Sequence, residues 1–230
     1  MSDPMINTGT IPFEIDGETH QTFFKTIGDV FDQSRTPVVV VHGGPGLAHD
    51  YLVPHIDLYT KSSIPVILYD QLGNSRSTHL PNKPKEFWTI DLFIDELVNV
   101  LRHFRIQDKY DIIGHSWGGM LSMEFIIRNR PEVAGLRHLV VSNSLASIKD
   151  WLAANSQQLA LFPEDVQASI KAGRNADVVA YRDALIKFNA VHCCRVTPFP
   201  KEVVYTFDQN HGIDADRSVT NALYAEFYDS

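Results

Sequence analysis

The residues best suited to chemistry surround one serine. Ser116 lies in the segment Gly114–Gly118 (GHSWG), which fits the pattern G-x-S-x-G. An apolar segment typical of a buried strand, Tyr110–Ile113, precedes it, and a helical pattern, Met120–Asn129, follows it. A serine on a sharp strand-to-helix turn is presented above the sheet at the positive end of the helix, where it can act as a nucleophile. The alternative interpretation is a structural Gly-Ser turn.

A second glycine-rich segment, His42–Gly46 (HGGPG), is suited to stabilising the charge that develops during acyl transfer. A tetrahedral oxyanion needs backbone N–H donors, and glycines let the backbone approach the substrate closely. We assign one donor to Gly44, with Gly43 as the other candidate in this loop, and the second donor to the N–H of Trp117. An ordinary turn at a strand end is the alternative for this segment alone, but both motifs together favour an acyl-transfer site.

Short apolar segments predict the strands that hold these motifs. Four of them end in polar residues or glycine: Thr36–Val41, Ile64–Tyr69, Tyr110–Ile113 and Leu139–Val141. Continuous apolar segments of this length are typical of buried strands in a parallel sheet, and such sheets bind ligands at the carboxyl ends of their strands. An intervening helix is indicated by apolar residues spaced 3, 4 and 3 apart, with three charged residues off that face: Ile94, Leu97, Leu101 and Phe104 against Asp95, Glu96 and Arg102.

From about Ala146 onward the pattern becomes helical. Trp151–Leu161, Val178–Val191 and Lys201–Phe207 have helical spacing, and no strand-like segment appears among them. The fold class is therefore α/β, with strands and helices alternating in the first part of the chain. We predict a parallel-sheet core over residues 1–145 and a helical lid over residues 146–230.

Composition and charge exclude several other classes of function. The 230 residues include 28 acidic and 20 basic ones, which gives a net charge of −8, whereas a nucleic-acid surface needs a basic patch. No stretch of about 18 apolar residues suggests a membrane span, and Met1–Gly28 lacks the pattern of a secretory signal. Cys193 and Cys194 are adjacent, which favours free thiols and a reduced, cytoplasmic location. We therefore expect neither a nucleic-acid nor a membrane partner.

Together with the stretch Asp70–Ser77 (DQLGNSRS), the two glycine-rich motifs resemble the proline iminopeptidase family of α/β-hydrolases. Leu47–Leu52 after HGGPG strengthens the likeness, which is closest to microbial and fungal aminopeptidases and amino-acid amidases. It covers about Ile11–Asn143 well and the helical part loosely. One departure is Ser75, where the family commonly has a second glycine (DQxGxGxS), so the turn at this position is expected to differ.

The resemblance implies a serine hydrolase that releases an N-terminal residue, often proline, from small peptides or amides through an acyl-Ser116 intermediate. It implies no cofactor. In this family an acidic residue of the lid holds the free amino group of the substrate, and the nearest match is Glu226 in Leu223–Phe227 (LYAEF). A carboxylate suits an ammonium group in a partly dry pocket.

The general base and its acid are missing from their expected positions. The resemblance places them after the lid, on later core strands, whereas no strand-like segment follows Ser144, so we expect a C-terminally truncated member of the family. His138 precedes its strand, at the opposite end of the sheet, and His192 reads as a half-buried structural residue. His211, in the segment Asp208–Asp214, is the remaining candidate for a relocated base, against an ordinary polar loop.

Three further histidines receive no role as a base. His115 is expected to point to the other side of the turn from Ser116, while His42 and His49 are expected to shape the oxyanion loop. No metal site is expected, because the sequence has neither H-E-x-x-H nor a spaced cysteine pair.

The predicted sheet would end at an open, apolar strand, Leu139–Val141. Such an edge favours association, so we expect a second copy, another protein or a detached fragment to cover it. Two alternatives to the aminopeptidase hypothesis remain: a catalytically incomplete homologue with a binding or regulatory role, and a hydrolase of secondary-metabolite biosynthesis.

Overall fold

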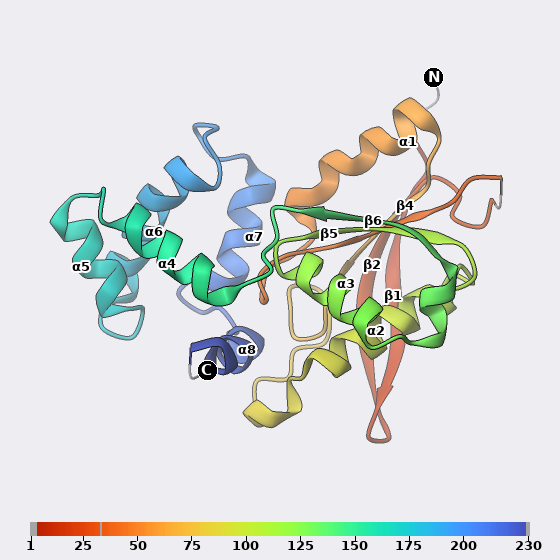
Figure 1. Cartoon of the computed structure of the whole chain (residues 1–230), viewed down its shortest axis with the longest axis horizontal. Helices are drawn as coiled ribbons and strands as arrows, with labels where there is room; N and C mark the ends of the chain where they lie inside the picture. The colour runs from red at the N-terminus through yellow and green to blue at the C-terminus, as the bar shows by residue number, and fades with distance from the viewer. Residues whose placement is uncertain (1–3, 33, 229–230) are drawn as a thin grey trace. The chain divides into compact units, whose positions relative to one another are not determined.

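The chain forms two compact units. The structure is a computed structural model that describes residues 4–32 and 34–228, with the side chains of the last helix described through Leu223 (Figure 1). Unit 1 comprises residues 1–145 and 216–230, and unit 2 comprises residues 146–215. The prediction of a lid over residues 146–230 therefore needs correction, because residues 216–230 group with the core.

Unit 1 is built on a six-stranded sheet with the order β1-β2-β4-β3-β5-β6. The strands are β1 (Ile6–Ile15), β2 (Glu18–Ile27), β3 (Val38–Val41), β4 (Val66–Asp70), β5 (Tyr110–His115) and β6 (Leu136–Ser142). β3 to β6 correspond to the four predicted segments and are parallel to their neighbours among these four. β1 and β2 pair antiparallel, as do β2 and β4, so the sheet is mixed rather than wholly parallel.

Both faces of the central strands are buried, which explains their continuous apolar sequences. In β3, Val39 and Val41 belong to one core cluster and Val38 and Val40 to another. The first cluster includes residues of α2 (Ile90–His103) and α3 (Trp117–Ile127), while the second packs against η1 (Asp50–His55) and α1 (Ile56–Ser62). Because successive side chains of a strand point to opposite faces, a strand between two helical layers needs apolar residues throughout.

The hairpin of β1 and β2 was not predicted from the sequence. In β1 only Ile11 and Phe13 are buried, because this strand lies at the end of the sheet, so the apolar signal is weak. The turn between the strands carries a stronger signal, since Asp16 and Gly17 both have positive φ angles, 52° and 82°. Asp-Gly is a preferred pair for a two-residue hairpin turn.

The predicted helix between β4 and β5 is confirmed, with one correction. α2 begins after Thr89, whose side chain accepts a hydrogen bond from the N–H of Leu92. The predicted apolar face, with Ile94 and Leu97, is fully buried. Because Glu96 is charged, the sequence pattern places it off this face, yet its side chain is also fully buried.

Unit 2 consists of helices only in the described residues. They are α4 (Ile148–Leu159), α5 (Glu164–Ala172), α6 (Val178–His192) and α7 (Lys201–His211). Its small core contains Leu159, Val166 and Ala184. Two expectations need correction: His211 ends α7 rather than lying in a loop, and His192 is exposed, with its ring 4.7 Å from that of Phe188.

The last helix, α8 (Ser218–Tyr228), packs within unit 1. Val219 and Leu223 are buried in the larger core cluster. The Thr220 hydroxyl donates a hydrogen bond to the carbonyl of Pro45, at 2.9 Å. Just before the helix, Asp216 pairs with His79 at 2.8 Å. These contacts attach α8 to the HGGPG loop and to the segment after β4.

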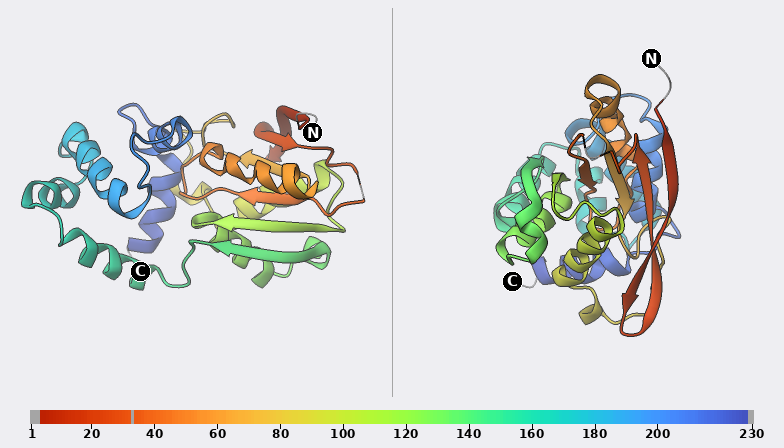
Figure 2. Two further views of the ribbon diagram at one scale, coloured as in Figure 1. Left: turned by 90° about the horizontal axis from the view of Figure 1, so that it is seen from above. Right: turned by 90° about the vertical axis from the view of Figure 1, so that its right-hand side faces the viewer.

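β6 is the last strand of the sheet and lies beside β5 (Figure 2). Among the described residues, no strand pairs with its outer edge. Val140 and Val141 are 52% and 44% exposed, and Ile127 of the adjacent α3 is 73% exposed. The edge is therefore apolar, as the sequence predicts.

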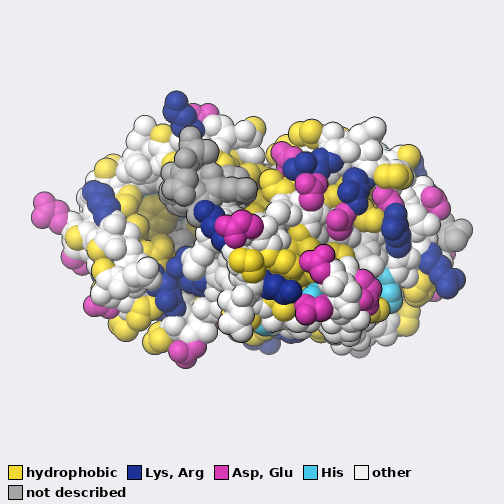
Figure 3. Space-filling view, turned by 90° about the horizontal axis from the view of Figure 1, so that it is seen from below, with side chains coloured by type: hydrophobic (Ala, Val, Ile, Leu, Met, Phe, Trp, Pro, Cys, Tyr) yellow, Lys and Arg dark blue, Asp and Glu magenta, His cyan; other side chains and the backbone are white. Residues whose placement is uncertain are grey.

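The surface and the helices can be compared with what a nucleic-acid partner or a membrane would require. On the face shown in Figure 3, Lys and Arg side chains lie among Asp and Glu side chains instead of forming one large basic patch. None of the described helices combines the length and apolarity needed to cross a bilayer.

The start of α6 generates a stability prediction. The Asp177 carboxylate accepts hydrogen bonds from the N–H groups of Val179 and Ala180, both at 3.0 Å. Loss of such a cap typically costs about 1 kcal/mol. We expect Asp177→Ala to lower the free energy of unfolding by that amount, measured by urea unfolding followed by circular dichroism. Asp183→Ala, which removes the same charge from an exposed position in the same helix, is the control, and equal effects of the two would contradict the capping role.

Candidate active site

Ser116 occupies a strained turn between β5 and α3. Its φ and ψ angles are 53° and −121°, in the region that favours glycine. The turn is held at both sides of the residue. The Ser116 N–H donates to the carbonyl of Ser142 at 3.0 Å, and the Ser116 carbonyl accepts from the hydroxyl of Ser144 at 2.7 Å. This is the geometry that the G-x-S-x-G pattern predicts.

The glycines around Ser116 are required by close backbone contacts. A side chain on Gly114 would lie 2.5 Å from the carbonyl oxygen of Gly118, and one on Gly118 would overlap the carbonyl of Val41. A side chain on Gly43 would lie 2.9 Å from Cβ of Ser116. β3, the turn and the start of α3 therefore pack backbone against backbone, and the HGGPG loop passes directly beside the serine.

In the HGGPG loop, the two candidate donors differ in their surroundings. The Gly43 N–H donates to the Tyr51 hydroxyl at 2.8 Å. Gly44 has a φ of 124°, and a side chain there would lie 2.6 Å from the backbone nitrogen of Gly46. The N–H of Gly43 is thus engaged by Tyr51, and Gly44 as an oxyanion donor stays a prediction.

Tyr51 also reaches the residue that precedes the nucleophile. Its hydroxyl lies 2.7 Å from Nδ1 of His115. Since the hydroxyl oxygen accepts from Gly43, its proton is available for Nδ1 of a neutral His115. Burial lowers the pKa of His115, with a smaller contribution from His55, and burial raises the pKa of Tyr51. Both side chains are therefore neutral near pH 7, as this pair of hydrogen bonds requires.

Gln71, directly after β4, connects the HGGPG loop to the residue that follows the nucleophile. Its backbone N–H donates to Nε2 of His42 at 3.0 Å, and its side-chain amide donates to the His42 carbonyl at 3.1 Å. Its side-chain oxygen accepts from the indole N–H of Trp117 at 3.0 Å. His42 is fully buried, and burial lowers its pKa, so it shapes the loop as a neutral ring.

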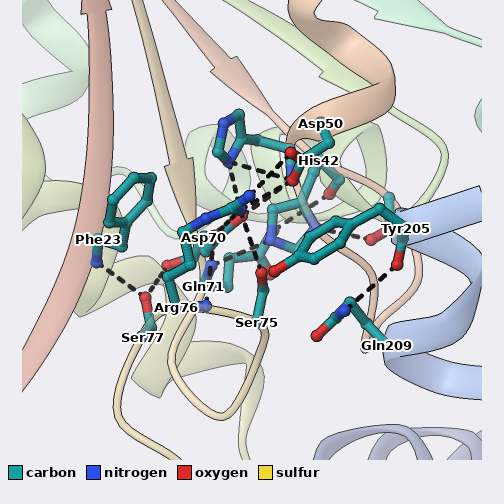
Figure 4. Close-up of polar contacts among 12 residues, drawn as sticks. Phe23, His42, Asp50, Asp70, Gln71, Ser75, Arg76, Ser77, Tyr205 and Gln209 are labelled. Carbon is teal, nitrogen blue, oxygen red and sulfur yellow. Dashed lines mark hydrogen bonds and ion pairs between the residues drawn. The ribbon is translucent and has the colours of Figure 1, made fainter. Parts of the chain in front are cut away.

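Asp70, the last residue of β4, is the centre of a buried ion-pair cluster (Figure 4). It accepts from the N–H and from Nδ1 of His49, at 2.9 and 2.8 Å, and pairs with Arg76 at 3.2 Å. Despite burial, the hydrogen bonds and charge of His49 hold the pKa of Asp70 well below its usual range. His49, Asp50 and Asp70 have the spacing of metal ligands, and Arg76 pairs with both carboxylates, with that of Asp50 at 2.9 Å.

The side chain of Glu96, in α2, binds the segment that follows β4. Its carboxylate accepts from the Leu72 N–H at 2.9 Å and from the Thr22 hydroxyl at 2.5 Å. Burial raises the pKa of Glu96 from 4.5 to about 7, although these two hydrogen bonds oppose the shift. The charge of Asp70 adds to the rise.

The turn at Ser75 keeps a backbone conformation that favours glycine. Ser75 has a φ of 52°, so the serine at the family's glycine position adopts the left-handed region. The departure from the family's glycine therefore costs roughly 1 kcal/mol, because a serine adopts a backbone conformation that suits glycine. Ser77, two residues on, donates to the carbonyl of Asp70 and accepts from the N–H of Phe23, which fixes the turn against β2.

The remaining predicted residues are placed as follows. His138 of β6 pairs with Asp111 near the start of β5, at the opposite end of these strands from Ser116. Among the described residues of unit 1, no histidine is hydrogen-bonded to the Ser116 hydroxyl. Glu226 lies in the part of α8 whose side chains are outside the described residues.

The contacts of Tyr51, Gln71 and Glu96 were not predicted, because they join residues far apart in the chain.

The raised pKa of Glu96 predicts a pH dependence of stability. An acid whose folded pKa exceeds its unfolded value binds more protons when folded, so its ionisation lowers stability as pH rises through both values. Between pH 4.5 and about 7, we expect wild type to lose about 3 kcal/mol relative to Glu96→Gln. Urea unfolding of both proteins across this pH range measures the difference, and parallel pH profiles would contradict it.

Comparison with known proteins identifies the family of the chain. Residues 36–181 match the model of the alpha/beta hydrolase fold family. The proline iminopeptidase of Lactobacillus delbrueckii subsp. bulgaricus is 33% identical over 181 residues, which cover 77% of this chain and 60% of that protein. The proline iminopeptidase of Clostridium botulinum is 29% identical over 76% of this chain and 58% of its own length. The chain thus matches about three fifths of the length of these relatives.

Two solved structures cover more of the chain. VinJ is 41% identical, with a TM-score of 0.82 over 94% of this chain and 70% of its own. The proline iminopeptidase of Mycobacterium smegmatis is 32% identical, with a TM-score of 0.74 and the same coverage of the two chains. The family match and these likenesses show that the chain belongs to the alpha/beta hydrolase fold family, in the group of the proline iminopeptidases.

Proposed function

We propose that this protein is a serine hydrolase of the proline iminopeptidase type, with Ser116 as the nucleophile. The observation that carries the proposal is the backbone of Ser116, held at φ 53° on the turn from β5 to α3, with the HGGPG loop against its Cβ. A strained serine between a strand end and a helix start is suited to nucleophilic attack.

The reaction is acyl transfer to Ser116, then hydrolysis. Oγ of Ser116 attacks the carbonyl carbon of the substrate and its proton passes to a general base. The tetrahedral oxyanion accepts hydrogen bonds from the N–H groups of Gly44 and Trp117. The C–N bond then breaks, and the amine leaves with a proton. Water attacks the acyl-serine, which regenerates the hydroxyl and releases the carboxylic acid. No residue is assigned as this base, and His211 stays the one candidate that the sequence leaves open for it.

The proposed substrates are small peptides, amides or arylamides with a free N-terminal residue, proline in the first place. The names of the relatives from Lactobacillus, Clostridium and Mycobacterium support this class. In the proposal, the carboxylate of Glu226 pairs with the substrate's ammonium group. A cytoplasmic location also remains a prediction. The two cysteines, on which it was based, are free in the structure.

The role of Ser116 is tested with a fluorophosphonate probe. We expect one covalent adduct on wild type and none on Ser116→Ala, by intact-mass measurement, because only an activated serine reacts at a useful rate. Ser156→Ala removes an exposed serine from unit 2 and should label like wild type. A folded wild-type protein without an adduct would contradict the proposed hydrolase and favour a binding role.

The substrate class is tested with prolyl arylamide and its N-acetylated form. We expect turnover of the free amine only, because acetylation removes the positive charge that Glu226 is proposed to hold. Glu226→Gln should raise KM for the free amine about tenfold or more, since a charge-assisted hydrogen bond is worth about 1.5–3 kcal/mol. Glu164→Gln, at an exposed position of α5, is the control. Equal turnover of the two arylamides would contradict recognition of the amino group.

A further inference from the structure

The two neighbours of Ser116 in the chain are each tied to the HGGPG loop by one side chain. His115, before the serine, is linked through the Tyr51 hydroxyl to Gly43. Trp117, after the serine, is linked through the Gln71 side chain to His42. The two links therefore connect the two sides of the nucleophile to two consecutive residues of the opposing loop.

The Tyr51 link is short and partly buried. Both of its hydrogen bonds measure 2.7–2.8 Å, and the rings of Tyr51 and His115 meet edge to face with centroids 5.1 Å apart. The Tyr51 oxygen, the His115 Nδ1 and the Ser116 Cβ all lie within 3.2 Å of the position that a side chain on Gly43 would take. The hydroxyl thus fills the space between the loop and the serine.

The Gln71 link uses every polar group of its side chain. The amide nitrogen donates to the His42 carbonyl, and the amide oxygen accepts from the indole of Trp117. Gln71 and His42 are fully buried, and Trp117 is nearly so. Buried polar groups that lose their partner cost about 1–3 kcal/mol each, so the side chain of Gln71 has one favourable orientation, and it fixes the distance between the loop and the start of α3.

We propose that Tyr51 and Gln71 are positioning residues that set the separation between Ser116 and the oxyanion loop. The inference rests on the proposed function and deepens it. The two proposed oxyanion donors come from the two linked segments, Gly44 from the loop and Trp117 from the start of α3. A donor stabilises the oxyanion only within about 2.7–3.1 Å of its oxygen. Tyr51 also engages the N–H of Gly43, the residue before the proposed donor Gly44.

The first experiment compares Tyr51→Phe with Tyr110→Phe. Tyr110 is a buried tyrosine at the other end of β5, and its hydroxyl donates to the Glu132 carbonyl at 2.8 Å. Both changes remove one oxygen and one hydrogen-bonding group. We expect Tyr51→Phe alone to slow fluorophosphonate labelling of Ser116, by about 100-fold, which is typical of a misplaced or lost oxyanion donor. A Tyr51→Phe protein that labels at the wild-type rate would overturn the proposal.

A second measurement does not need a reactive serine. In amide NMR spectra, Tyr51→Phe should shift the Gly44 and Trp117 backbone resonances and speed hydrogen exchange at Gly43, whereas Tyr110→Phe should leave all three unchanged. If wild type is not labelled, the proposed hydrolase fails, and these spectra still decide the positioning role. Unchanged Gly44 and Trp117 resonances in Tyr51→Phe would overturn it.

The Gln71 link is tested by Gln71→Met, which keeps the length of the side chain and removes its polar atoms. We expect the Trp117 indole N–H resonance to move and labelling to slow to a similar extent as in Tyr51→Phe. Gln167→Met, a change of the same kind in unit 2, is the control. A folded Gln71→Met protein with unchanged labelling and an unchanged indole resonance would remove Gln71 from the proposal.

Discussion

The contact of backbone with backbone at the ends of β3 and β5 is the constraint on which the site depends. Gly118 packs its Cα onto the carbonyl of Val41, and Gly114 packs against Gly118. This approach brings the start of α3 to the strand ends and leaves Ser116 the narrow turn between them. The strain of its φ angle is stable because the hydrogen bonds to Ser142 and Ser144 and the surrounding core determine the turn.

Three consecutive residues, the last of β4 and the two that follow it, connect this site to the rest of unit 1. Asp70 binds the His49 segment, Gln71 binds His42 and Trp117, and the N–H of Leu72 binds Glu96. Each of these contacts joins segments far apart in the chain. The DQLG segment is therefore a junction between the HGGPG loop, the start of α3 and α2.

The sequence predicts the parts of this arrangement that depend on local pattern. Strands buried on both faces need apolar side chains throughout, so β3 and β4 are visible as apolar segments. β5 and β6 also carry short apolar segments, although Val140 and Val141 of β6 are exposed, and the glycines of the turn mark Ser116. The β1–β2 hairpin is less visible, because an end strand buries few side chains, although Asp16–Gly17 marks its turn. The placement of α8 in unit 1 could not be predicted, since its apolar spacing is compatible with packing against either unit.

Glu96 shows why residue type alone misplaces a side chain. Its carboxylate would be costly in the core without donors, and a helical pattern assigns it to the outer face. The donors are the hydroxyl of Thr22 and the N–H of Leu72, and neither can be paired with α2 from spacing. The same limit applies to Tyr51, whose partners Gly43 and His115 belong to two motifs that sequence analysis treats separately.

The two buried carboxylates near the site, Asp70 and Glu96, differ in their ionisation. Asp70 is ionised, because the guanidinium of Arg76 pairs with it and His49 donates hydrogen bonds to it. Glu96 has no cation among its described partners, and the charge of Asp70 raises its pKa further. Near neutral pH the segment after β4 is thus held by one carboxylate that is fully charged and another that is close to its midpoint. The fully charged carboxylate, Asp70, lies toward the HGGPG loop, where Arg76 pairs with it. The less charged carboxylate, Glu96, lies in the core, where a full negative charge would cost the most free energy.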